Sequence, residues 1–164
     1  MWSPDRRAVL LGLLAVSGLA ACGLSPVYGP GGGGGKLFGK VRPRDPDTPL
    51  DFVFNRRLAE RLGPEDAAVY DLDYQINAGV VAQAITPDEV TTRYSLNGTA
   101  DFALTGPDGA VITRGRVSSF TSYSTTGTTI STLAAEGDAR ERLALMLADQ
   151  VVTRLLAAAR TLPD

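Results

Sequence analysis

The feature that most restricts the fold of this chain is a strict alternation of apolar and polar residues that begins at Tyr70. The even-numbered positions carry apolar or small side chains: Tyr70, Leu72, Tyr74, Ile76, Ala78, Val80 and Ala82. The odd-numbered positions include the polar residues Asp71, Asp73, Gln75, Asn77 and Gln83. Because successive side chains of a strand point to opposite faces of a sheet, this period of two predicts a long strand with one solvated face.

A second run repeats the alternation after a break at residues 85–90, ITPDEV. One face of this run would carry Tyr94, Leu96, Gly98, Ala100, Phe102 and Leu104. The other face would carry Arg93, Ser95, Asn97, Thr99, Asp101 and Thr105. Residues 106–109, GPDG, form a turn by composition, and residues 110–124 return from it with less regular alternation. We therefore expect an antiparallel meander of three strands, with Gly115 as the candidate position of a bulge.

An amphipathic helix is predicted before the meander. Thr48 followed by Pro49 fits an N-cap and a proline in the first turn, and Gly63-Pro64 fits the stop. Its apolar side chains recur at a spacing of four, at Leu50, Phe54, Leu58 and Leu62. A helix with one such stripe needs another layer to cover it.

A second amphipathic helix is predicted after the meander, and its start is open between two alternatives. Asp138 with Glu141 has the pattern of a capping box, whereas Ser131 or Thr132 would start the helix one or two turns earlier. The earlier start would place Gly137 inside the helix at a cost of about 1 kcal/mol. The apolar stripe contains Leu143, Leu147, Val151 and Leu155, and the helix would end near Arg160.

These elements define the expected fold class. A short first strand over residues 36–41, KLFGKV, completes the order β-α-β-β-β-α. A mostly antiparallel sheet with two amphipathic helices on one face is an α+β two-layer sandwich. The other sheet face would be polar. Two interpretations of it stay open: it is solvated, which is usual for antiparallel sheets, or it meets a polar partner surface.

The first 22 residues have the pattern of a targeting segment. Arg6 and Arg7 precede a short apolar run, and small residues follow it, as in a secretory signal. The run is shorter than the roughly 20 residues that a transmembrane helix needs. Leu19, Ala20, Ala21 and Cys22 further resemble a bacterial lipobox, in which cleavage after residue 21 leaves the cysteine as the first residue. The alternatives are an ordinary signal with a chance cysteine, and export by either the general or the twin-arginine route.

The lipobox resemblance implies a lipid anchor. Cys22 would carry a diacylglycerol group and an N-acyl chain, and each buried methylene contributes about 0.8 kcal/mol of membrane affinity. In the lipoproteins that this segment resembles, a glycine after the cysteine, here Gly23, favours the outer membrane. We therefore expect residues 1–21 to be a signal peptide, residues 22–35 a lipidated glycine-rich tether, and residues 36–164 a single domain.

Composition excludes several classes of function. The chain has no histidine and only one cysteine, so Ser-His and Cys-His nucleophilic sites and the usual zinc ligand sets are excluded. A formal net charge of −2 does not favour nucleic-acid binding, which usually requires a basic patch. We expect no catalytic residue, no metal and no cofactor besides the acyl chains. The alternative is a periplasmic hydrolase that uses the carboxylates of Asp71, Asp73 or Asp101.

Three stretches resemble the LptE family, the outer-membrane lipoproteins of lipopolysaccharide assembly. They are residues 22–29, CGLSPVYG; residues 93–124, RYSLNGTADFALTGPDGAVITRGRVSSFTSYS; and residues 134–156, AAEGDARERLALMLADQVVTRLL. The order of the predicted elements is similar to that family as well. The chain departs from the family pattern at Leu24, where an aromatic residue is usual, and in the inserted glycines Gly31–Gly35.

The resemblance implies a role as the plug and assembly partner of the β-barrel LptD, in contact with lipopolysaccharide. Because lipopolysaccharide is anionic, its candidate contacts are the cations Arg93, Arg114 and Arg116. We do not match the basic loop residues proposed for the family to residues of this chain, and the loop at residues 85–90 is acidic. The alternative is an accessory lipoprotein of an envelope lipid transporter or of a secretion system.

Overall fold

The computed structural model describes residues 27, 29, 32–85 and 91–162. Its elements are α2 (Gly33–Leu37), β1 (Val41–Pro43), α3 (Pro49–Leu62), β2 (Tyr70–Ile85), β3 (Thr91–Thr105), β4 (Val111–Ser124), α4 (Thr129–Ala158) and the 3-10 helix η1 (Ala159–Thr161). The sheet order is β1-β2-β3-β4, with β1 parallel to β2 and the remaining pairs antiparallel. The α+β sandwich with the predicted order is confirmed, with α2 as an additional element.

The helix α3 has the predicted boundaries because its two ends are specified locally. The Thr48 hydroxyl accepts a hydrogen bond from the Asp51 amide at 3.2 Å, and the Asp51 carboxylate accepts one from the Thr48 amide at 3.0 Å. This reciprocal capping box satisfies amides that the first turn leaves free. Gly63 ends the helix with a φ of 80°, a conformation that glycine adopts without strain.

The helix α4 starts earlier than both predicted alternatives. Thr128 is its N-cap, and the Thr128 hydroxyl accepts a hydrogen bond from the Ser131 amide at 3.3 Å. Gly137 therefore lies inside the helix. Next to it, Arg140 Nη2 and Glu136 Oε1, one turn apart, form an ion pair at 2.7 Å. The predicted stripe is fully buried: Leu143, Leu147, Val151 and Leu155.

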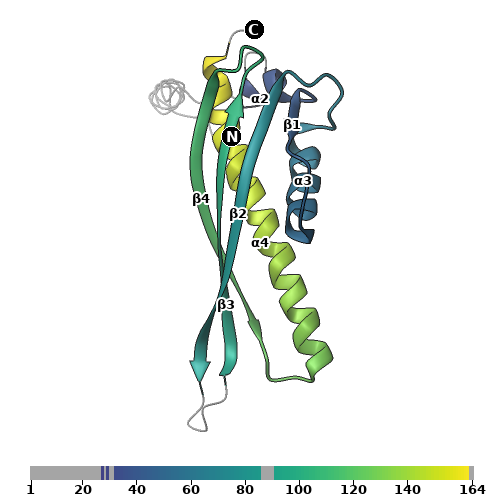
Figure 1. Cartoon of the computed structure of the whole chain (residues 1–164), viewed down its shortest axis with the longest axis vertical. Helices are drawn as coiled ribbons and strands as arrows, with labels where there is room; N and C mark the ends of the chain where they lie inside the picture. The colour runs from purple at the N-terminus through teal and green to yellow at the C-terminus, as the bar shows by residue number, and fades with distance from the viewer. Residues whose placement is uncertain (1–26, 28, 30–31, 86–90, 163–164) are drawn as a thin grey trace, which may run out of the picture.

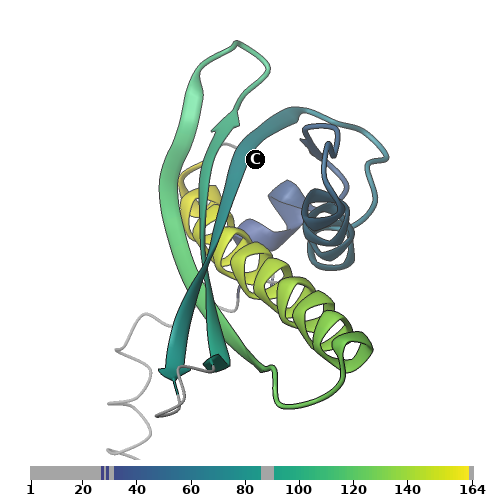
Figure 2. The same ribbon diagram turned by 60° about the horizontal axis from the view of Figure 1, so that its bottom comes forward.

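Figures 1 and 2 show α4 crossing one face of the meander diagonally, with α3 beside it on the β1 side. The core lies between these helices and the sheet. It includes Phe54, Leu58 and Leu62 of α3, the α4 stripe, and Leu72, Leu96, Phe102 and Leu104 of the strands. Among the described residues, no helix covers the opposite sheet face.

The bulge predicted at Gly115 is wrong. Gly115 pairs regularly with Phe102, and the register of β3 and β4 shifts between Leu104 and Thr105, beside the turn. A side-chain carbon at Gly115 would lie 3.2 Å from the Phe102 ring. The glycine therefore makes room for a cross-strand aromatic ring and leaves the hydrogen-bond ladder unbroken.

The first strand and the described end of the tether also differ from prediction. Residues 33–37 form α2, and β1 begins only at Val41. Gly33 and Gly34 are buried. A side-chain carbon at Gly33 would lie 2.7 Å from the Leu156 carbonyl oxygen of α4, and Lys36 Nζ donates to the Leu162 carbonyl oxygen at 2.6 Å. The last glycines of the tract thus belong to the folded domain, because a residue without a side chain permits this close approach.

Candidate functional site

The uncovered sheet face is the candidate functional surface, and the strand register determines which residues form it. A side-chain carbon at Gly98 would lie 2.7 Å from Leu143 Cδ2, so the even positions of β3 face α4 and the odd positions face away. We call the uncovered side the open face. Its cross-strand rows include Gln75–Asp101–Arg116, Asn77–Thr99–Ser118 and Gly79–Asn97–Phe120.

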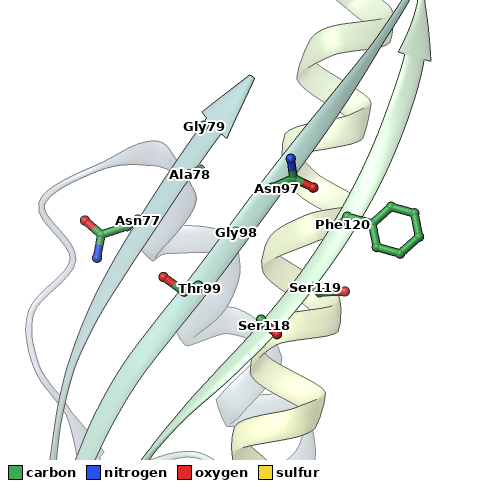
Figure 3. A pocket seen from close by; sticks show the side chains of 9 residues that line it. All are labelled: Asn77, Ala78, Gly79, Asn97, Gly98, Thr99, Ser118, Ser119 and Phe120. Atoms are coloured by element: carbon green, nitrogen blue, oxygen red, sulfur yellow. The ribbon is translucent and has the colours of Figure 1, made fainter. Parts of the chain in front are cut away.

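The middle of the open face is a shallow depression of about 830 Å³. Figure 3 shows Asn77 on β2, Asn97 and Thr99 on β3, and the Phe120 ring projecting from β4. Phe120 is 71% exposed, although most of its neighbours on this face are amides and hydroxyls. The depression is therefore uncharged and hydrogen-bonding, with one aromatic ring at its margin.

The end of the open face nearer the Gly106–Gly109 turn carries charges that neutralise one another. Arg116 Nε donates to Asp101 Oδ1 at 2.6 Å, and Arg116 Nη2 donates to Asp101 Oδ2 at 3.0 Å. These hydrogen bonds, together with the negative charge of Asp101, raise the pKa of Arg116. A second depression of about 400 Å³ lies beside the pair and is lined by Asp73 and Arg114, among others.

The three predicted arginines do not form one cluster. Arg114 and Arg116 lie two residues apart on β4 and share the open face. Arg93 instead lies on β3, ten residues from Ala103, which is the cross-strand partner of Arg114. At about 3.3 Å per residue, this separation is roughly 33 Å along the strand.

Of the carboxylates in the alternative hydrolase hypothesis, Asp71 and Asp101 are each held by an arginine, and Asp73 lines the depression beside Asp101. Asp71 accepts a hydrogen bond from Arg42 Nη2 at 2.8 Å, and Asp101 is bonded to Arg116. Asp101 is paired across the sheet with Gln75, four residues along β2 from Asp71. Within residues 32–85 and 91–162, no three potential metal ligands of the His, Cys, Asp and Glu types come together.

An ion-pair network joins the two helices on the covered side. Asp149 of α4 accepts hydrogen bonds from Arg57 Nε at 2.9 Å, from Arg57 Nη2 at 3.0 Å and from Arg61 Nη1 at 2.9 Å. Arg56 reaches Glu141 at 2.7 Å. The hydrogen bonds to Asp149 and Glu60 raise the pKa of Arg57. This network ties α3 to α4 on the covered side of the sheet.

Sequence reasoning missed Phe120, because residues 117–124 carry polar side chains at both even and odd positions. The signal that identifies its face is the β3 register, in which Phe120 stands opposite the polar Asn97. The lipobox residues Leu19, Ala20, Ala21 and Cys22 lie outside the described residues, so lipid attachment stays a prediction. None of the helices in the described part of the chain combines the length and apolar character of a membrane span.

Comparison with known proteins gives one family and several related folds. The family model of LptE, described as lipopolysaccharide-assembly, matches residues 40–155. A lipoprotein from Caulobacter crescentus is 18% identical, with a TM-score of 0.66 over 79% of this chain and 98% of the other. Rare lipoprotein B from Shewanella oneidensis is 15% identical, with a TM-score of 0.56 over 72% and 92%. A minor lipoprotein from Acinetobacter baumannii is 16% identical, with a TM-score of 0.52 over 72% and 89%. No curated protein sequence matches significantly. At these identities, the structural likeness shows a common fold.

Proposed function

Since the chain belongs to the LptE lipopolysaccharide-assembly family, we propose that it is an envelope lipoprotein that acts as the plug and assembly partner of an LptD-like outer-membrane β-barrel. Acyl chains on Cys22 would hold it at the outer membrane, and it would act by binding, without catalytic turnover.

The observation that carries the proposal is the open face. The lumen of an outer-membrane barrel is polar, so a domain that enters it needs a polar exterior. The open face offers amides and hydroxyls from Asn77, Asn97, Thr99 and Ser118. Its charged end presents the bonded pair of Arg116 and Asp101. Charges transfer into a confined site at lower cost when they are paired and hydrogen-bonded.

The arginines also limit where lipopolysaccharide would bind. Arg116 already shares its charge with Asp101, whereas Arg93 lies on an exposed strand position far from that pair. Arg93 and Arg114 are therefore the stronger candidates for a contact with anionic phosphate groups. Their separation implies two distinct contacts on one extended ligand or on two ligand molecules.

The proposal is tested by purifying the lipoprotein from outer membranes and measuring the recovery of the barrel. The double variant Thr99→Glu with Ser118→Glu places two charges in the middle of the open face and should reduce barrel recovery at least tenfold. The matched control Ala157→Glu places a charge at an exposed position of α4 and should retain the barrel.

Depletion of the protein supplies the second measurement. Lipopolysaccharide should then fail to reach the cell surface, and the barrel should misassemble. Normal surface lipopolysaccharide after depletion, or recovery of the wild-type protein as a stable monomer without a barrel, would contradict the proposal. Recovery with inner-membrane transporter or secretion components would favour the alternative role.

A further inference from the structure

The strand β2 has a free edge whose polar groups can be assigned to individual residues. The Tyr70 amide donates to the Lys40 carbonyl oxygen at 3.0 Å, and the Arg44 amide donates to the Leu72 carbonyl oxygen at 2.9 Å. Both bonds lie on the β1 side of β2. The backbone N–H and C=O of one strand residue point to the same edge of the strand, and this direction alternates from residue to residue. The backbone N–H and C=O groups of the even-numbered β2 residues therefore point away from β3, toward the free edge.

Beyond Leu72, none of the described strands pairs with this side of β2. β1 ends at Pro43, opposite Leu72, and the outward groups of Ile76, Ala78, Val80 and Ala82 have no backbone partner within the described part of the chain. We call residues 76–82 the β2 edge. Its sequence INAGVVA contains no charge and no proline, and Val80 and Val81 are 43% and 49% exposed.

Natural sheets usually protect exposed edges with charges, with prolines or with a covering element. The opposite edge of this sheet, on β4, follows that rule. Gln150 of α4 donates to the Ser118 carbonyl oxygen at 3.1 Å, and Arg142 donates to the Ser122 carbonyl oxygen at 3.4 Å. Arg114 and Arg116 add charge to the rest of β4. Unlike β4, the edge of β2 has none of these protections within the described part of the chain.

An apolar groove of about 500 Å³ adjoins the β2 edge at Ile76, between the first turn of α3 and the middle of α4. Leu50, Val53 and Ile76 supply its apolar lining. Two charged side chains at its rim are already paired, since Arg140 bonds to Glu136 and Glu141 bonds to Arg56. The groove thus favours an uncharged apolar side chain.

We propose that the β2 edge receives an extended, uncharged segment of another polypeptide, which adds to the sheet as a further strand. Its main chain would bond the outward groups of Ile76, Ala78, Val80 and Ala82, as in β-augmentation. The residue opposite Ile76 would project its side chain on the helix side of the sheet and fill the groove. The inference goes beyond the barrel-plug role and does not depend on it.

A second copy of this chain fits the same edge less well. In an antiparallel pair, residues whose backbone groups point to the shared edge lie opposite one another. If two copies paired symmetrically along residues 76–82, Ala82 of the second copy would lie opposite Ile76. One methyl group leaves most of the groove open. The edge is about 23 Å long, and a strip roughly 10 Å deep buries roughly 500 Å² in total, below the ~1,200 Å² of a stable dimer. The occupant is therefore a segment of a partner that also binds elsewhere.

The experiment introduces a photo-crosslinking amino acid at Ala78, Val80 or Ala82, one position at a time, in the full-length lipoprotein in intact cells. Cross-linked residues are then identified by mass spectrometry. The three positions should map to a single stretch of one other polypeptide, in order and at intervals of two residues. Cross-links that are scattered over several proteins, or that reach only lipid, would overturn the proposal.

A pair of variants tests the hydrogen bonding itself. Val80→Pro removes only an outward N–H, so the β2–β3 ladder is retained, and edge strands tolerate such a proline. It should lower cross-linking from Ala78 at least tenfold, whereas Val80→Ala, which keeps the N–H, should not. Similar thermal midpoints of the two variants establish equal folding. Equal cross-linking by both variants, or a homodimer that Val80→Pro dissociates, would refute addition of a foreign strand.

Discussion

Two glycines of α2 that lie two residues apart should respond to alanine with opposite signs. At Gly33, the added carbon would lie 2.7 Å from the Leu156 carbonyl oxygen and 2.9 Å from Ala159 Cβ. Overpacking of this kind costs about 1–3 kcal/mol. At Gly35, nothing lies within 4 Å of the added carbon. There, alanine gains only its helix propensity, which is about 1 kcal/mol over glycine.

The same propensity gain offsets part of the strain at Gly33. The net loss of unfolding free energy for Gly33→Ala is therefore at most about 2 kcal/mol, and Gly35→Ala should raise the unfolding free energy by up to about 1 kcal/mol. Urea unfolding followed by circular dichroism measures both values, provided that the slope m stays constant among the variants. Wild-type protein is the common reference.

The outcome distinguishes a packed helix from a tether. If residues 33–35 were a flexible linker, both substitutions would leave the unfolding free energy within error of wild type. Equal changes at the two positions, or a stabilising effect of Gly33→Ala, would refute the close approach of α2 to α4.

Three further predictions concern other parts of the molecule. Asp149→Ala should lower the unfolding free energy by up to about 1 kcal/mol, because Arg57 and Arg61 lose a shared, half-buried carboxylate; the loss should shrink in 1 M salt, as thermal unfolding at two salt concentrations would reveal. Burial raises the pKa of Tyr74 from 10.0 to about 12. The folded state therefore keeps a proton that the unfolded state loses above pH 10, so the unfolding free energy should fall by about 2 kcal/mol between pH 10 and 12, and Tyr74→Phe should abolish that component. Cys22→Ser should release the protein from outer membranes in a fractionation assay, since the acyl chains supply its affinity; retention of the variant would show that lipidation is not the anchor.

The elements that the sequence predicted correctly carry their signals locally. The helix α3 is bounded by Thr48, Asp51 and Gly63, whose roles depend only on near neighbours. The long strands follow from alternation, which states the sheet face of each residue directly. Local signals were insufficient for α4, because Gly137 suggested an interruption that the cap at Thr128 and the packing of the helix override.

The features that were missed depend on residues far apart in the chain. The helix α2 is buried against Leu156 and Ala159, and the bond from Lys36 to Leu162 spans 126 residues. No pattern within a glycine tract contains that information. The exposed ring of Phe120 and the unpaired edge of β2 similarly follow from strand register and from where β1 stops. The alternation of apolar and polar side chains does not determine the strand register or the residue at which β1 ends.

The packing of α2 against the C-terminal end of α4 also determines how far the domain would extend from a membrane anchor in the proposed barrel complex. The helix α4 has 30 residues and is about 45 Å long, and α2 packs at its C-terminal end. The Val27 carbonyl oxygen accepts a hydrogen bond from the Gly34 amide at 2.9 Å, so a lipid on Cys22, as proposed, would be attached five residues before this contact. The hydrocarbon layer of a bilayer is about 30 Å thick. A domain standing upright from an inner-leaflet anchor would therefore carry the N-terminal end of α4 past the whole apolar layer, to the level at which the outer leaflet meets the medium.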